Sequence, residues 1–283
     1  MRVLVLGNAQ RPGVKEEAER LLPVVREHTE VVAVDLSQEL DLAGIDADIC
    51  LVLGGDGAIL RAARQMGYKQ LPVLGVNLGK LGFLADLTPD DLLCCFAGVA
   101  KGEYRVTHHL MFECVVEGSS PKRVFLGLNE IAIQSGPPFQ MIDLDLIIDG
   151  ELVSSYAGDG LILSTPIGST AHNLSAGGPI LGQELDAFVI TPICSHSLTS
   201  RPVVDSSGKQ YRITLSDDSC PAIMIVDGQQ IASLNAKDWI DIQRAPVTFR
   251  LVKVPGRTYY QTLRDKLRWG TTPNYRNEPA SEV

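Results

Sequence analysis

The stretch from Ile49 to Arg64 constrains the fold of this chain more than any other. It reads ICLVLGGDGAILRAAR, which is a short apolar run, the turn Gly54–Gly57 and a helical pattern. A strand, a glycine turn and a helix start in this order can bind phosphate, because glycine lets the backbone approach an anion and the helix start offers free N–H groups. The alternative is an ordinary turn between a strand and a helix, since Asp-Gly pairs are common turn formers.

One acidic residue, Asp56, makes this turn chemically unusual. A carboxylate repels a bound phosphate unless it holds a metal ion or accepts a proton from an attacking hydroxyl group. Asp56 is therefore a candidate catalytic residue, and Gly54–Gly57 is a candidate phosphate loop.

Short apolar runs alternate with helical patterns through the first hundred residues. Strands are predicted at 3–6, 31–36, 49–53 and 72–76, and helices at 14–28, from the glycine loop to about 67, and from Thr88 onward. This alternation predicts an α/β domain with a parallel, Rossmann-like sheet. Ligands of such sheets bind at the carboxyl ends of the strands, which is where the glycine loop falls.

From about residue 103 the pattern changes to strand-like alternation and turns. Apolar residues take one parity in 106–116 and in 142–148. Further strands are predicted at 188–194, 211–215, 222–226 and 247–254. The second half is therefore expected to be a mainly β domain, a β-sandwich.

Two Asp-Gly pairs, Asp149-Gly150 and Asp227-Gly228, are typical of hairpin turns. Helical spacing returns at 258–269, with core positions expected at Tyr259, Leu263 and Leu267. We expect an α/β domain at 1–102, a β-rich domain at 103–254, and a C-terminal segment, 255–283, that packs back on the first domain.

Composition limits the possible functions. With 283 residues, 45% of them apolar, the chain has room for about two domains and a sizeable core. A net charge of −9 argues against nucleic acid or an anionic membrane as a partner. No apolar run approaches the roughly 20 residues that span a bilayer. The six cysteines include no C-x-x-C pair, and no secretory segment is seen, so a cytoplasmic location is expected.

Two other segments carry chemistry. In LNEIAI, Asn129 and Glu130 interrupt an apolar run, and such a pair suits two neighbouring sugar hydroxyls; the alternative is a solvent-facing pair on a half-exposed strand. In 157–180, a hydroxyl-rich turn at Ser169 and Thr170 marks a helix start, and small residues leave space for a flat ring. The alternative there is a tightly packed loop that crosses the sheet.

The histidines give no metal site. His108 and His109 are neighbours on a predicted strand, so they face opposite sides, and His196 is given no role. No residue is assigned as a metal ligand. Asp227 is interpreted as a turn residue, and Gln229 could reach a ligand.

Together these segments resemble the NAD kinase family. The motifs NLGKLGFLAD, LNE, GDGLILSTPIGSTAHNLSAGGPI and PICSHSLTSRPVV match in order between Gly54 and about Gln229. GGDG alone is less specific, because diacylglycerol and sphingosine kinases contain it and phosphofructokinases have a similar form. The resemblance implies an α/β domain and a β-rich domain with the site between them.

The resemblance also implies individual roles. Asp56 looks like the family's proton acceptor, and Gly54–Gly57 looks like its ATP phosphate loop. The resemblance also implies that Gly57 contacts the NAD nucleotide and that Arg61 is a basic contact. Asn129 and Glu130 are similar to the pair that holds the NAD ribose. The remaining implied NAD contacts are Asp159, Thr170, Ala171, His172, Asn173, Leu174, Ser175 and Gln229.

The chain departs from the family pattern at five positions. Ala58 stands where threonine is usual and His172 where tyrosine is usual. Ile167 takes the place of a small or hydroxyl residue, and Ala157 and Gln140 replace basic or histidine contacts of some members. These changes bear on substrate preference more than on the reaction.

The implied reaction transfers the γ-phosphoryl group of ATP to the 2′-hydroxyl of the adenosine ribose of NAD, giving NADP. A divalent ion, Mg²⁺, would assist, and the resemblance implies a homodimer or homotetramer. One alternative is a GGDG kinase with a lipid or sugar acceptor, against which no amphipathic membrane-lying helix is found. The other is a nucleotide-binding sensor without catalysis, against which Asp56 and Glu130 are both present.

Overall fold

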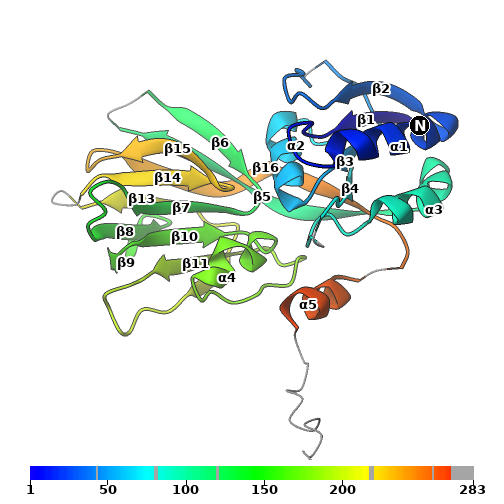
Figure 1. Cartoon of the computed structure of the whole chain (residues 1–283). Coiled ribbons are helices and arrows are strands. Elements are labelled where there is room, and N and C mark those ends of the chain that lie inside the picture. Colours follow the sequence, from blue (N-terminus) through cyan, green and yellow to red (C-terminus); the bar gives the residue numbers. More distant parts are fainter. Residues whose placement is uncertain (43, 80–81, 119–120, 217–219, 257, 269–283) are drawn as a thin grey trace, which may run out of the picture.

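The structure is a computed structural model that describes residues 1–268 except 43, 80–81, 119–120, 217–219 and 257. It consists of an N-terminal α/β lobe and a C-terminal β lobe (Figure 1). The predicted end of the last helix at 269 and the tail to 283 lie outside the described residues. None of the described helices is long and apolar enough to cross a membrane.

The N-terminal lobe has four parallel strands in the order β2-β1-β3-β4, which confirms the predicted parallel sheet. Helices α1 and α3 pack on one face and α2 packs on the other, so β3 and β4 are buried along their whole length. The elements are β1 (Arg2–Leu6), α1 (Val14–His28), β2 (Glu30–Asp35), β3 (Ile49–Leu53), α2 (Asp56–Met66), β4 (Val73–Val76) and α3 (Pro89–Ala100).

The C-terminal lobe is the predicted β-sandwich. Its strands are β5 (Arg105–Glu117), β6 (Arg123–Gly127), β7 (Glu130–Ser135), β8 (Ile142–Ile148), β9 (Glu151–Gly158), β10 (Gly160–Ser164), β11 (Ala187–Ile193), β12 (Val203–Ser206), β13 (Tyr211–Leu215), β14 (Ala222–Val226), β15 (Gln229–Leu234) and β16 (Trp239–Lys253). Between β10 and β11 lie a 3₁₀ turn, Gly168–Thr170, and the short helix α4 (His172–Ser175). The last helix is α5 (Tyr259–Leu267).

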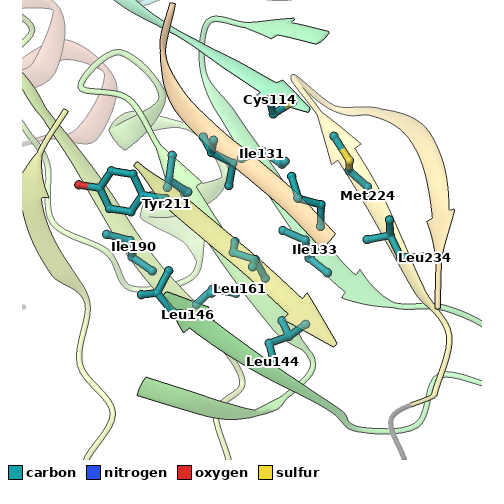
Figure 2. Packing of buried hydrophobic residues seen from close by; sticks show 14 of the residues in the cluster. Cys114, Ile131, Ile133, Leu144, Leu146, Leu161, Ile190, Tyr211, Met224 and Leu234 are labelled. Atoms are coloured by element: carbon teal, nitrogen blue, oxygen red, sulfur yellow. The ribbon is translucent and has the colours of Figure 1, made fainter. Parts of the chain in front are cut away.

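The two layers of the sandwich enclose one apolar core. One layer is an antiparallel sheet in the order β12-β11-β10-β7-β14-β15, and the other contains β13, β8 and β9. Side chains from both layers interdigitate, among them Ile133, Leu161 and Ile190 facing Leu146 and Tyr211 (Figure 2). The alternation predicted at 142–148 is confirmed, because every second residue of β8 is buried.

Strand β16 joins the two lobes into one ten-stranded sheet. It pairs in parallel with β4 through Leu251 and Val73, and it pairs antiparallel with β13 and β5. Its pairing with β5 shifts register between Arg244 and Thr248, around Pro246, which has no N–H to donate. The sheet of the α/β lobe therefore continues directly into the sandwich.

The two predicted hairpin turns are confirmed. Asp149-Gly150 joins β8 to β9 and Asp227-Gly228 joins β14 to β15, with φ values of 50°, 85°, 47° and 75° respectively. Positive φ at both central residues is the geometry of a type I′ turn, which matches the twist of the flanking strands.

Helix α5 differs in one respect from its prediction. Leu263 is buried as expected, but Leu267 is 36% exposed and is not a core residue. The helix is only nine residues long, so its last turn extends past the surface that Leu263 covers. Its contacts include both lobes, since Lys266 lies 4.1 Å from the centre of the Phe83 ring and the Tyr259 hydroxyl donates to Leu181 O at 3.4 Å.

We expect the stability of the sandwich to depend strongly on Phe112, which is 0% exposed. Gly127 lies opposite on β6, and a Cβ there would be 2.1 Å from the ring. We expect Phe112→Ala to lower the free energy of unfolding by about 3–5 kcal/mol in urea titrations, because the cavity cannot collapse fully. Val124→Ala, at a position 47% exposed on β6, is the control and should change it by less than ~0.5 kcal/mol. Equal effects of the two changes would contradict this account of the core.

Candidate active site

The glycine loop lies at the carboxyl end of β3, at the edge of the sheet where ligands of parallel sheets bind. Gly54 has a φ of 140°, and a Cβ there would also lie 2.8 Å from Ala58 Cβ, so this position requires glycine. The Gly54 N–H donates to Val76 O at 2.8 Å, and helix α2 begins at Asp56 with Gly55 as its N-cap. The predicted strand, glycine turn and helix start are thus present.

A pocket of about 480 Å³ opens beside this loop. It is lined by Gly54, Gly55, Gly57 and Ala58, and two arginines, Arg11 and Arg61, belong to its wall. The Arg61 guanidinium also donates to the Gln38 side-chain oxygen. A helix start and two guanidinium groups around one pocket suit a polyphosphate, and they supply the local positive charge that this acidic chain needs.

The Asp56 carboxylate is held by the backbone of the NLGKLGFLAD segment. It accepts hydrogen bonds from the N–H groups of Phe83, Leu84 and Ala85 at 2.8, 3.0 and 3.1 Å. A Cβ at Gly82 would lie 2.1 Å from Asp56 Oδ1, so a glycine there allows this close approach. A carboxylate has about four lone-pair sites, and three are used, which leaves one for a metal ion or a hydroxyl group.

The Asn129–Glu130 pair lies at the start of β7. Glu130 is only 6% exposed, so the interpretation as a solvent-facing pair is wrong for this residue. Asn129 Oδ1 and Glu130 Oε2 are buried and have no hydrogen-bond partner within the described part of the chain. Two buried polar atoms without hydrogen-bond partners are costly unless a ligand or water pairs with them.

Burial raises the pKa of Glu130 to about 8, and the charge of Asp227 adds to this effect. A hydrogen bond from the backbone N–H of His172 acts in the opposite direction. The protonated form of Glu130 is therefore favoured at neutral pH.

Asp227 has a second role that the sequence analysis missed. Its carboxylate accepts the N–H groups of Leu128, Asn129 and Glu130 at 2.9, 2.7 and 3.2 Å. Burial raises the pKa of Asp227, whereas these three donors and the positive charge of Arg64 on α2 oppose the rise. An Asp-Gly pair reads as a turn in the sequence, and no local signal shows that its carboxylate binds a segment about a hundred residues earlier.

On its other side, the backbone of the Asn129–Glu130 segment is hydrogen-bonded to Thr165, which directly follows β10. Thr165 N–H donates to Asn129 O at 2.9 Å, and the Thr165 hydroxyl donates to Leu128 O at 2.6 Å. A Cβ at Gly168 would lie 2.1 Å from Asn129 O, so glycine allows the 3₁₀ turn to approach this backbone. Asn129 and Glu130 are thus fixed on both sides.

The segment 157–180 is tightly packed. A 3₁₀ turn covers Gly168–Thr170, where the helix start was expected, and α4 follows at His172. Asn173 is buried, and its side chain donates to Ser169 O and Pro179 O and accepts from the Thr191 hydroxyl. His172 Nε2 lies 3.5 Å from Gln134 Nε2, and burial lowers the pKa of His172. The predicted contact segment Thr170–Ser175 therefore lies beside the Asn129–Glu130 pair.

Two other predicted contacts, Asp159 and Gln229, are exposed. Asp159 directly precedes β10, and the last residue of this strand, Ser164, pairs with Glu130. Asp159 and Ser164 are five strand residues apart, so about 16 Å of strand separates Asp159 from the position opposite Glu130. Asp159 is exposed, and its charge and hydrogen bond raise the pKa of Cys194. Gln229 is exposed at the start of β15, two residues after Asp227. Their contact with a nucleotide stays a prediction.

The two halves of the site meet at the boundary between the lobes. Leu128 and Ile167 belong to the same apolar cluster as Ile59 of α2 and Leu84 and Ala85, whose N–H groups bind Asp56. Figure 1 shows α2 on the side of the N-terminal lobe that faces the sandwich. Ile167, one of the departures from the family pattern, is therefore a packing residue of this boundary.

The histidines lie as predicted, on opposite faces of β5. His108 is exposed, whereas His109 is buried and lies 2.8 Å from the Thr107 hydroxyl through Nε2. Burial lowers the pKa of His109 to about 4. Within the described part of the chain no three His, Cys, Asp or Glu side chains cluster closely enough to hold a metal ion.

A parallel α/β sheet that ends in a glycine-rich phosphate loop, joined to a sandwich that presents a buried amide–carboxylate pair, defines a two-domain nucleotide-binding protein. The family model of the ATP-NAD kinase N-terminal domain matches residues 5–104, and that of the ATP-NAD kinase C-terminal domain matches residues 128–254. The chain belongs to the ATP-NAD kinase family.

Curated relatives support this assignment over most of the chain. The NAD kinase of Rhodopirellula baltica is 44% identical, covering 95% of this chain and 86% of the relative. The NAD kinase of Geotalea daltonii is 38% identical, covering 91% of this chain and 94% of the relative.

Solved structures share the fold. An NAD kinase from Archaeoglobus fulgidus in complex with ATP has a TM-score of 0.76 at 30% identity, covering 95% of this chain and 99% of that chain. Yeast NADH kinase complexed with NADH has a TM-score of 0.87 and covers 98% of this chain and 90% of that chain. Its identity is 24%, so this likeness concerns the fold alone.

A buried ion pair lies next to the segment that holds Asp56, and we expect it to stabilise the folded protein. Lys253 Nζ lies 2.6 Å from Asp86 Oδ2, with side chains 14% and 13% exposed, and Asp86 directly follows Ala85. Lys253→Met leaves a buried carboxylate unpaired, so we expect a loss of about 3–5 kcal/mol in the free energy of unfolding. The control is Lys209→Met, which removes the more exposed pair with Asp205 and should cost much less, because water screens that pair. Similar losses in both variants would contradict the expectation that the buried Lys253–Asp86 pair contributes more to the free energy of unfolding than the exposed pair.

The raised pKa of Glu130 predicts a pH dependence of stability. Its pKa is about 8 in the folded protein against 4.5 for an unperturbed group, so the folded state holds an extra proton between these values. The free energy of unfolding should therefore fall as pH rises through this window. Glu130→Gln cannot titrate, so its stability relative to the parent protein should increase by a few kcal/mol between about pH 5 and pH 8 in urea titrations. A pH-independent difference would contradict the assignment.

Proposed function

We propose that the protein transfers the γ-phosphoryl group of ATP to the 2′-hydroxyl of the adenosine ribose of NAD, which yields NADP. The observation that carries this proposal is the Asn129–Glu130 pair, in which one buried side-chain oxygen of each residue has no hydrogen-bond partner among the residues that the structure describes. Neighbouring ribose hydroxyls, which can both donate and accept a hydrogen bond, would pair with these two atoms. Membership of the ATP-NAD kinase family supports the same assignment.

The pocket of about 480 Å³ beside the glycine loop is the proposed site of the ATP phosphates. The start of α2 and the guanidinium groups of Arg11 and Arg61 would neutralise part of the phosphate charge. Ala58 belongs to this wall and provides no hydroxyl contact.

A magnesium ion fits this arrangement. Mg²⁺ keeps several waters and binds substrate phosphates with one or two protein carboxylates, which suits a site where Asp56 has one open lone-pair position. When bound, the ion would supply charge neutralisation on the polyphosphate.

Asp56 is the proposed proton acceptor. As the 2′-oxygen forms its bond to the γ-phosphorus, the bond from this phosphorus to the bridging oxygen of ADP breaks, and the 2′-hydroxyl proton passes to the Asp56 carboxylate. The three N–H donors from Phe83, Leu84 and Ala85 would fix the direction in which the carboxylate faces. The protein thus aligns two substrates and accepts one proton.

The remaining parts of the proposal rest on the family resemblance. We infer a homodimer or homotetramer that works in the cytoplasm and whose substrates are the small molecules ATP and NAD. His172, Ala157 and Gln140 would tune which substrate is preferred, since they replace larger or basic contacts.

An assay of the purified chain tests the proposal directly. We expect NADP to form from NAD and ATP with Mg²⁺, and Asp56→Asn to lower the rate by about 10²–10⁴ while NAD still binds, because a positioned base is worth that range. Asp46→Asn, at an exposed ion pair with Arg2, is the control and should leave the rate unchanged. NADH and inorganic polyphosphate are tested as alternative acceptor and donor. Phosphorylation of diacylglycerol or a sugar in place of NAD would overturn the proposal, and near-normal turnover of Asp56→Asn would remove Asp56 from its role.

A further inference from the structure

A second pocket of about 660 Å³ lies where the start of β5, the end of β16 and the start of α5 meet. It is larger than the glycine-loop pocket and shares no lining residue with it. Its volume is within the range of small-molecule sites, and the proposed reaction uses none of its residues.

Two cations stand side by side in its wall. Arg105 on β5 and Lys253 on β16 are direct cross-strand partners. Like charges directly opposite each other destabilise a sheet, and this pair occurs in a chain whose net charge is −9. Lys253 has an ion pair with Asp86, whereas Arg105 has none within the described part of the chain. A bound anion would relieve this repulsion.

The start of α5 adds two features to the same wall. Thr258 and Gln261 cap each other, so the positive end of the helix begins in the pocket wall with Tyr259 and Tyr260 in its first turn. Tyr260 is 66% exposed, and its ring centroid lies 5.6 Å from that of Tyr259. An exposed aromatic ring beside two cations is a surface on which a flat, phosphate-bearing ligand can stack.

We propose that this pocket binds a nucleotide as an effector. Its phosphate lies between Arg105, Lys253 and the start of α5, and its base stacks on Tyr260. Glu184 is the carboxylate among the lining residues, and it disfavours a second phosphate on that side.

The pocket is connected to Asp56 through contacts of both of its walls. Lys253 pairs with Asp86 at 2.6 Å, and Asp86 directly follows the residues whose N–H groups hold Asp56. On α5, Lys266 lies over the ring of Phe83, which is another of these donors. A phosphate that attracts Lys253 competes with Asp86, so an effector changes how firmly the Asp56 segment is held. The effect on the Asp56 segment rests on the proposed function, whereas the binding of a nucleotide in this pocket does not.

Direct binding tests the pocket. The enzyme is saturated with NAD and a non-hydrolysable ATP analogue, and AMP, ADP and NADP are each titrated by equilibrium dialysis. We expect at least one of them to bind at one further site per chain, and Arg105→Gln to weaken this binding about ten- to hundredfold, since a charged hydrogen bond is lost. Tyr260→Ala should weaken it as well. Arg250→Gln is the matched control, because it removes an exposed arginine of β16 outside the pocket.

Failure of all three nucleotides to bind the saturated enzyme would overturn the proposal, as would unchanged binding in both Arg105→Gln and Tyr260→Ala. Kinetics test the coupling: at saturating ATP and NAD, the binding nucleotide should change kcat, and Arg105→Gln should lose this response while its basal kcat stays unchanged. Binding without any change in kcat would overturn the connection through Lys253 and Asp86. A chain that does not phosphorylate NAD at all would refute the proposed function, yet the dialysis would still decide about the pocket.

Discussion

The pairing of β5 with β16 is the constraint on which the rest of the structure depends. These strands belong to the sandwich at one end and, through Leu251 and Val73, to the α/β sheet at the other. Because hydrogen-bonded strands hold a fixed register, the edge that carries the glycine loop and the edge that carries Asn129 and Glu130 keep a fixed relation. The apolar cluster that joins α2 to Leu128 and Ile167 then fills the boundary. The candidate site is thus built where two lobes share one backbone framework.

Within that framework, the polar groups of the site are positioned mainly by backbone amides. Asp56 and Asp227 each accept three N–H groups, and each binds a segment far away in the sequence. Arg64 on α2 and Asp227 attract each other across the boundary, so the helix that begins with Asp56 also stabilises the carboxylate that holds the sandwich half of the site. Polar groups held in this way need little reorganisation when a charged substrate binds.

Local patterns predicted much of this. Periodicity indicated the strands around the glycine loop and in β8, and residue types indicated the two Asp-Gly hairpins and the start of α3 after Thr88. Contacts between distant segments were missed, because no local pattern encodes them: the carboxylate of Asp227 on Asn129, and the continuity of β16 with β4. Leu267 was misplaced, since helical spacing gives a face but not the extent of the surface beneath it. The distance of Asp159 from Glu130 follows from a strand pairing that sequence alone does not give.

The shared sheet has a consequence for motion. A hinge between two lobes ordinarily lies in a flexible linker, but here a continuous strand crosses the boundary, and its regular pairing with β5 is interrupted between Arg244 and Thr248. Bending of one lobe against the other would therefore concentrate at the bulge around Pro246, where the ladder already lacks a donor. Outside this bulge, the regular pairing of β16 with β5 keeps the two lobes at a fixed spacing.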